Sequence, residues 1–283
     1  MGESISGHLT CESLKYAIPI RVYVDLDPGF TQFWHDQGVL GTQLEGHTHY
    51  YTVGENIGTQ DCPLPTSGID WRPVRQPVVL EDWPVATTDS TWRFTTIASW
   101  RGSYGPVHVG DKTYGLKVHE FRKFIELPRC IDREFEIALD IHPDEEKDLQ
   151  LLRENQWQLV DPRAVAGDPN HYRAYVQKSG AEFSVAQGMY VDTQGGWFSD
   201  RTIRYLASGK PVLVQDTGFG RNLPVGEGLM AFRTIDEAVA GAGEIANNYD
   251  RHSRAARKVA EEFFDSDKVL ATMLKQIGAN SDL

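Results

Sequence analysis

The stretch that decides the fold is "GGWFSDRTIRYLASGKPVLVQDTG", which runs from Gly195 to Gly218. Ser199 can cap a helix over residues 200–207, and the free backbone N–H groups and the helix dipole at its start suit a phosphate or another anion. After the turn Ser-Gly-Lys-Pro comes the apolar run 212–214, which is typical of a short buried strand. The stretch therefore predicts a loop, a helix, a turn and a strand in close succession.

The same alternation continues on both sides of this stretch. Strands are expected at 94–100, 134–141, 157–161, 181–189, 211–216 and 229–232, and helices at 116–127, 143–155, 171–179, 200–207, 234–264 and 265–277. Strands that alternate with helices of about ten residues indicate βαβ units and a parallel sheet. We therefore predict an α/β, doubly wound, Rossmann-type domain over residues 93–283.

Residues 1–92 differ from the rest of the chain. Two strands are expected there, within 18–28 and 47–58, and the segment 61–84 holds five prolines and two tryptophans, which predicts an irregular crossing between domains. Two strands are too few for a second complete α/β domain. This part is therefore expected to be a partial, Rossmann-like N-terminal domain with a linker.

Composition excludes several classes of protein. The net charge is −12 and the pI is near 5.2, whereas a general nucleic-acid binder needs a basic face. No apolar run is long enough to span a membrane, and the N-terminus lacks a signal-peptide pattern. The three cysteines, Cys11, Cys62 and Cys130, are far apart and form neither a metal motif nor a disulfide framework. We expect a cytoplasmic protein without bound metal.

Three glycine-rich loops are expected at the carboxyl edge of the sheet, at 100–117, 195–198 and 216–229. In open parallel sheets ligands bind at that edge, and glycines let a ligand approach the backbone. The first loop also carries Arg101, Lys112 and Lys117, which could meet a diphosphate. The alternatives are a solvated loop whose cations pair with acids and an ordinary capped glycine turn. Three such loops on one edge favour a nucleotide-type ligand.

Other side chains have two interpretations each. His142 lies at a strand end and either faces the ligand or is an ordinary loop histidine. Trp197 either stacks on a base or sugar or is buried with its neighbour. Asp25 and Asp27 alternate at a strand end, where a turn is favoured over a metal site.

Several longer stretches carry a resemblance to a known family. "LASGKPV" (206–212), "GEGLMAFRTIDEAVAG" (226–241) and "AARKVAEEFFDSDKVLATML" (255–274) resemble the donor-binding half of GT-B-fold glycosyltransferases of the broad group-1 kind. Within that group the chain looks closest to bacterial proteins with a "GWFSDR" signature. "SISGHL" (4–9), "RVYVDLDPGFTQFW" (21–34) and "TVGENIG" (52–58) resemble the late part of their acceptor-side domain. The resemblance covers nearly the whole chain and implies that the front of the N-terminal domain is missing.

This resemblance implies a hexosyltransferase-like transfer of a sugar from a nucleotide diphosphate sugar to an unknown acceptor, without a cofactor. Arg101 and Lys117 would neutralise the diphosphate. The full set of expected donor-binding residues is Arg101, Lys117, His142, Gly195, Gly196, Trp197, Ser199, Asp200, Arg201, Thr217 and Gly218. No catalytic residue is assigned.

The chain departs from the family pattern in one respect. Gly196 and Arg204 occupy the positions of two glutamates that many group members carry eight residues apart, and Asp200 or Glu227 is the candidate substitute for the ribose-binding carboxylate. Two other functions remain open: a non-catalytic nucleotide or nucleotide-sugar binding module, and a nucleotide-sugar epimerase of GT-B architecture. Exposed apolar surface on an incomplete first sheet would also favour a homo-oligomer.

Overall fold

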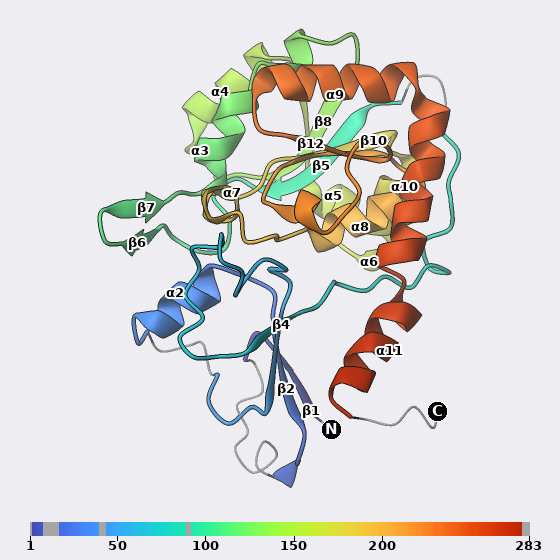
Figure 1. Ribbon diagram of the computed structural model, residues 1–283. Coiled ribbons are helices and arrows are strands. Elements are labelled where there is room, and N and C mark those ends of the chain that lie inside the picture. Colours follow the sequence, from blue (N-terminus) through green and yellow to red (C-terminus); the bar gives the residue numbers. More distant parts are fainter. Residues whose placement is uncertain (1, 8–16, 40–43, 89–91, 279–283) are drawn as a thin grey trace.

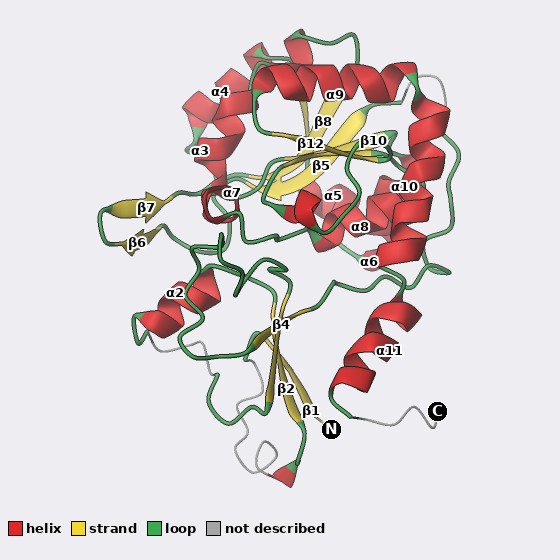
Figure 2. Ribbon diagram, in the orientation of Figure 1, coloured by secondary structure: helices red, strands yellow, loops and turns green. Residues whose placement is uncertain are grey.

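The computed structural model of the chain describes residues 2–7, 17–39, 44–88 and 92–278 (Figure 1). Cys11 lies outside these residues. Two parallel sheets dominate the described part, and helices cover the larger one (Figure 2). One sheet lies within residues 2–88, called the N-terminal half below, and the larger one within residues 92–278, called the C-terminal half. This arrangement agrees with the predicted α/β class.

The C-terminal half contains a six-stranded sheet in which every pair of neighbours is parallel. Its strands are β5 (Phe94–Ser99), β8 (Phe135–Asp140), β9 (Trp157–Val160), β10 (Ala181–Ser184), β11 (Val212–Gln215) and β12 (Leu229–Phe232). They lie in the order β12-β11-β10-β5-β8-β9. The strand order therefore reverses between β5 and β10, which makes the sheet doubly wound and creates a switch point where ligands bind in such folds.

Helices cover both faces of this sheet. They are α3 (Lys117–Phe121), α4 (Glu146–Glu154), α5 (Pro162–Ala166), α6 (Pro169–Lys178), α7 (Gly188–Thr193), α8 (Asp200–Ala207), α9 (Ile235–Asn247) and α10 (Tyr249–Phe263). One core packs around Phe94, Phe135 and Phe183, and a second around Tyr205 and Val212. Most residues of the central strands are buried whichever face they point to, because both faces are covered.

Three local predictions for this half were wrong. The strand predicted over 181–189 ends at Ser184, and the helix α7 follows it. The loop 100–117 contains an antiparallel hairpin, β6 (Val107–Val109) with β7 (Lys112–Tyr114). The helix predicted over 116–127 is only α3 followed by two short 3₁₀ turns, in the second of which Pro128 occupies one of the first positions.

The N-terminal half contains a four-stranded parallel sheet, in the order β1 (Gly2–Ile5), β2 (Arg21–Asp25), β3 (His49–Thr52) and β4 (Trp71–Pro73). The expectation of two strands was therefore wrong. The two additional strands lie at the sheet edges, and β4 is short and contains proline, which edge strands tolerate. Helix α2 (Phe30–Asp36) follows β2.

The end of the chain returns to the N-terminal sheet. Helix α11 (Ser266–Gln276) lies beside that sheet in Figure 1, and Met273 and Ile277 pack with Val22, Val24 and Tyr51. The segment between β4 and β5 is bonded to the turn before this helix, where Val78 N–H donates to Phe264 O at 2.8 Å and Val78 O accepts from Ser266 N–H at 3.1 Å.

The two halves also share an apolar core. Phe30 and Leu64 of the N-terminal half belong to the same buried cluster as Met189 and Tyr190 of α7. A second contact comes from the hairpin, where Tyr114 stacks on Phe33 of α2 at 5.1 Å between ring centres. The carboxyl edge of the large sheet is therefore partly covered by the N-terminal half.

Candidate functional site

Arg201 forms hydrogen bonds with both strands at the switch point, β5 and β10. Its guanidinium donates to Ile97 O on β5 at 2.9 Å, and on β10 to Ser184 Oγ and Glu182 Oε1, both at 2.6 Å. The side chain is largely buried and starts from the first turn of α8. Arg201 therefore fixes α8 against the point where the strand order reverses.

Lys117 begins α3 beside this arginine and is half-buried. Burial, the largest cause, and repulsion from Arg201 together lower the pKa of its ammonium to about 7, against the opposing attraction of Glu182. Lys117 makes no hydrogen bond or ion pair with any residue that the structure describes. When it is protonated, two cations face one carboxylate here, an arrangement that favours an incoming anion.

Arg101 and His142 lie at a neighbouring part of the same edge. They line a pocket of about 430 Å³ at the carboxyl ends of β5 and β8, together with Ser99, Trp100, Asp140, Ile141, Pro143, Glu145 and Arg163. Arg101 is 59% exposed and pairs with Glu145. His142 is exposed, and its Nδ1 lies 3.6 Å from Asp144 Oδ2. The cation that interacts with Lys117 is thus Arg201, while Arg101 borders an adjacent pocket.

The glycines of the loop 195–198 lie against the N-terminal half. Asn56 N–H donates to Gly195 O at 3.0 Å, and Asn56 Nδ2 donates to Gln194 O at 2.8 Å and to Gly218 O at 3.0 Å. A Cβ at Gly196 would lie 3.0 Å from the backbone nitrogen of Asn56, and Gly196 has φ +84°. These glycines therefore accommodate the loop that follows β3.

The remaining predicted residues surround this contact. Ser199 Oγ caps α8 by accepting Arg201 N–H at 3.3 Å, and the exposed Asp200 pairs with Arg204 at 2.8 Å. Thr217 donates its hydroxyl to Trp197 O. The ring of Trp197 stacks on Tyr190, with ring centres 4.2 Å apart. The structure thus gathers these side chains in one region but gives most of them partners within the protein.

Sequence reasoning missed Asn56 and Glu182. Asn56 stands in "GENIG", which the sequence predicts only as a glycine loop. Its contact with Gln194 joins residues about 140 positions apart in the chain, so no local pattern indicates it. Glu182 lies within a predicted strand, where a charged residue on a buried face signals a buried ion pair. That signal was available in the sequence.

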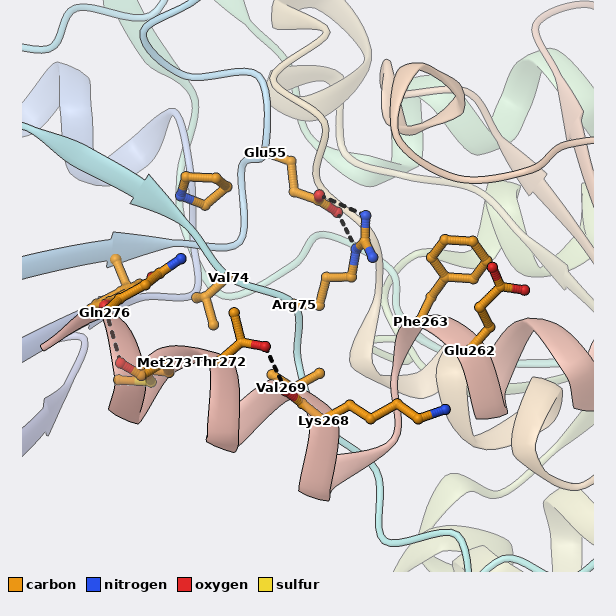
Figure 3. A pocket seen from close by; sticks show the side chains of 12 residues that line it. Glu55, Val74, Arg75, Glu262, Phe263, Lys268, Val269, Thr272, Met273 and Gln276 are labelled. Carbon is orange, nitrogen blue, oxygen red and sulfur yellow. Dashed lines mark hydrogen bonds and ion pairs between the residues drawn. The ribbon is translucent and has the colours of Figure 1, made fainter. Parts of the chain in front are cut away.

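A separate pocket of about 220 Å³ lies between the N-terminal sheet and helices α10 and α11 (Figure 3). Arg75 lines this pocket. Its guanidinium nitrogens donate to the two carboxylate oxygens of Glu55 at 3.0 and 3.1 Å, and its guanidinium carbon lies 5.0 Å from the centre of the Phe263 ring. The cations there already have partners, since Lys268 donates to Glu261 O. This pocket lies away from the carboxyl edge of the large sheet.

Two further findings concern the described residues only. They contain no cluster of three or more His, Cys, Asp or Glu side chains placed to hold a metal ion. Among their helices we find no candidate for a membrane span.

No model of a protein family matches the chain, and no curated protein matches its sequence. Solved structures do resemble it. A sucrose-phosphate synthase from Thermosynechococcus elongatus aligns over 95% of this chain and 70% of its own, with TM-score 0.59 and 10% identity. HepE from Anabaena, solved with UDP-glucose, aligns over 92% and 72%, with TM-score 0.59 and 10% identity. A glycosyltransferase from Rickettsia africae aligns over 99% and 98%, with TM-score 0.53 and 11% identity.

The chain has the GT-B fold. The predicted fold class is therefore confirmed, and the switch point between β5 and β10 is the part of the GT-B fold at which Lys117 and Arg201 meet.

Proposed function

We propose that this protein is a cytoplasmic glycosyltransferase that moves a sugar from a nucleotide diphosphate sugar to an acceptor. The observation that carries the proposal is Lys117, which has no hydrogen-bond or ion-pair partner among the described residues, beside Arg201 at the switch point of a GT-B fold. The structure of HepE with UDP-glucose supports it by fold similarity.

In this proposal Lys117 contacts the diphosphate, and the pocket beside Arg101 and His142 receives the nucleoside. The diphosphate gains negative charge as the bond to the sugar breaks. A fixed cation in a partly buried site stabilises that charge more in the transition state than in the bound substrate. Arg201 holds α8 and β10 in place around this cation.

The first test is a binding screen of the purified chain against UDP, GDP, ADP and TDP and their glucose conjugates, by thermal shift and calorimetry. A ligand that binds only the folded state raises its melting temperature. We expect one nucleotide family to bind. Lys117→Ala and Arg101→Ala should each weaken that binding by about 1–3 kcal/mol, which is roughly 5- to 150-fold.

Lys112→Ala is the matched control. Lys112 belongs to the same loop, is 52% exposed and pairs with Asp192 at 3.8 Å, so its removal should leave the affinity within twofold. Equal affinities in all three variants and the wild type would rule out the proposed role of this loop.

The second candidate is a binding module without turnover. It is favoured by one observation, the contact of Asn56 with the backbone of Gly195 and Gly218, which the resemblance assigns to the donor site. Slow release of UDP from UDP-glucose, with water as acceptor, would favour the transferase. Tight binding of the same ligand with no release over hours would favour the module.

A further inference from the structure

The turn after β2 is held by a buried carboxylate. Asp25 is fully buried and accepts hydrogen bonds from Thr31 Oγ1 at 2.7 Å, Gln32 Nε2 at 2.9 Å and Thr52 Oγ1 at 2.7 Å, and from the backbone N–H of Asp27 at 3.1 Å. A carboxylate can only accept, and four donors around it fix its position. The position of Asp27, two residues later, is thereby fixed as well.

Asp27 directs its side chain toward the C-terminal half. Tyr190 of α7 donates to Asp27 Oδ1 at 3.2 Å, and Tyr104 of the loop after β5 donates to Asp27 Oδ2 at 3.1 Å. Each carboxylate oxygen has two acceptor positions, so one position on each remains after these bonds. Asp27 is half-buried, so part of this residue remains open to solvent.

Charged and titratable groups from three elements act on Asp27. Burial raises the pKa of its carboxyl, the two phenols lower it, and repulsion from Asp200 at the start of α8 raises it. Burial, followed by the nearby Asp27 and Asp25, raises the pKa of Tyr104 to about 12, so this phenol remains a donor at neutral pH.

Further aromatic rings pack against the two tyrosines that bond this carboxylate. Trp197 stacks on Tyr190 at 4.2 Å, and Phe30 and Trp34 lie against Tyr104 at 4.9 and 5.1 Å between ring centres. Trp34, Tyr104 and Trp197 are only partly buried. Apolar ring faces beside an acceptor-only group suit a polyhydroxylated ligand, which has apolar C–H faces and hydroxyl donors at its edge.

We propose that Asp27 accepts a hydrogen bond from a sugar hydroxyl, with Asp25 as the residue that positions it. The proposal deepens the proposed function, on which it rests for the nucleotide part of the ligand. The hydroxyl belongs either to the sugar of the donor or to a sugar acceptor, and the chemistry of recognition is the same for both.

The test compares wild type with Asp27→Asn by calorimetry. The probes are UDP, GDP, ADP and TDP, each alone and as its glucose conjugate, and methyl α-D-glucopyranoside with and without the diphosphates. If the hydroxyl belongs to the donor, the variant binds the glucose conjugate at least about tenfold more weakly and the diphosphate alone within twofold. If it belongs to an acceptor, only binding of the methyl glucoside is lost.

Asp36→Asn is the matched control. Asp36 ends α2, nine residues further along the chain, is exposed and accepts from Ser67 at 3.0 Å, so the same change of charge should alter no affinity. The melting temperature of Asp27→Asn at pH 7 should not fall, because the substitution removes a carboxylate that burial disfavours.

Three results would overturn the proposal: an equal loss of affinity for the diphosphate alone, unchanged affinity for every sugar-bearing probe, or no contribution of the sugar to binding by the wild type. If no diphosphate binds the wild type, the proposed function fails. Binding of the methyl glucoside alone, and its loss in Asp27→Asn, then decides the role of Asp27 separately.

Discussion

At the scale of single residues, Lys117 links ligand binding to pH. Its pKa is about 7 in the free protein because of burial and Arg201. A bound diphosphate would favour the ammonium and raise this pKa. We therefore expect uptake of a fraction of a proton on binding between pH 7 and 8.5, and affinity that falls as the pH rises through this range. Calorimetry in two buffers of different ionisation enthalpy measures the uptake directly.

Lys117→Met removes the titrating group and should abolish the proton uptake attributed to it, whereas Lys112→Met should leave the uptake unchanged. If the uptake persisted in Lys117→Met, the proton would belong to another residue.

The ammonium of Lys117 also affects the stability of the fold. Its pKa is lower in the folded than in the unfolded state, where it is near 10.4. Between about pH 7 and 10 the unfolded chain therefore binds more protons, and this group makes the free energy of unfolding rise with pH.

The carboxyl of Asp27 changes the free energy of unfolding with pH in the opposite direction. Burial raises the pKa of its carboxyl above the value of 3.8 for an exposed group, so the folded state binds this proton more tightly than the unfolded state. The contribution of Asp27 to the free energy of unfolding therefore falls as the pH rises from 3.8 through the pKa of the folded state. We expect Asp27→Asn to be more stable than wild type at pH 7, with the difference shrinking toward pH 4. Urea midpoints between pH 4 and 8 measure this, and a pH-independent difference would contradict it.

At the scale of elements, the local sequence pattern was sufficient to predict those helices and strands that neighbouring residues determine. Helix α8 and strand β11 follow from a cap, a turn and a β-branched run, and both lie where they were predicted. Helix α7 was missed because "VAQGMY" continues the apolar run of β10. Its helical state depends on Met189 and Tyr190 packing against the N-terminal half. The hairpin β6–β7 was missed for a similar reason, since Tyr114 packs on Phe33.

The glycine loop before α8 gives a prediction at this scale. Gly196→Ala should destabilise the protein by about 2–4 kcal/mol, because the added Cβ meets Asn56 at 3.0 Å and alanine disfavours φ +84°. Gly243→Ala is the control. Gly243 lies within α9, where no atom of the described residues comes within 4 Å of an added Cβ, and the substitution should stabilise by up to about 1 kcal/mol. Chemical denaturation measures both, and a neutral Gly196→Ala would show that the loop tolerates a side chain.

At the scale of the whole molecule, the sequence indicated the edge where the candidate site lies but not its composition. Lys117 was recognised from its place in a glycine-rich loop after a strand. Its interaction with Arg201 and Glu182 depends on α8 and β10 meeting at the switch point, which joins residues 65 to 84 positions away from it. The role of Asn56 depends on how the two halves pack, and no local pattern encodes that contact. The parts of the site that were missed are therefore those made by packing between distant segments.

This packing predicts that the two halves unfold as one unit. Asn56 is buried, and every polar group of its side chain is paired: Nδ2 donates to Gln194 O and Gly218 O, and Oδ1 accepts from Asn222 Nδ2 at 3.0 Å. Asn56→Asp replaces the donor by a charged acceptor that faces two carbonyl oxygens. We expect a loss of about 3 kcal/mol or more, since a buried charge would be left without a partner.

Calorimetric unfolding tests whether the two halves unfold together. The wild type should unfold in a single transition whose calorimetric and van't Hoff enthalpies agree, because a shared apolar core couples the halves. In Asn56→Asp the transition should move to lower temperature or split in two. Asn247→Asp, an equal change of charge at an exposed position, should do neither. Two transitions in the wild type would instead mean that the halves are independent, and that the contact of Asn56 with the glycine loop opens without unfolding.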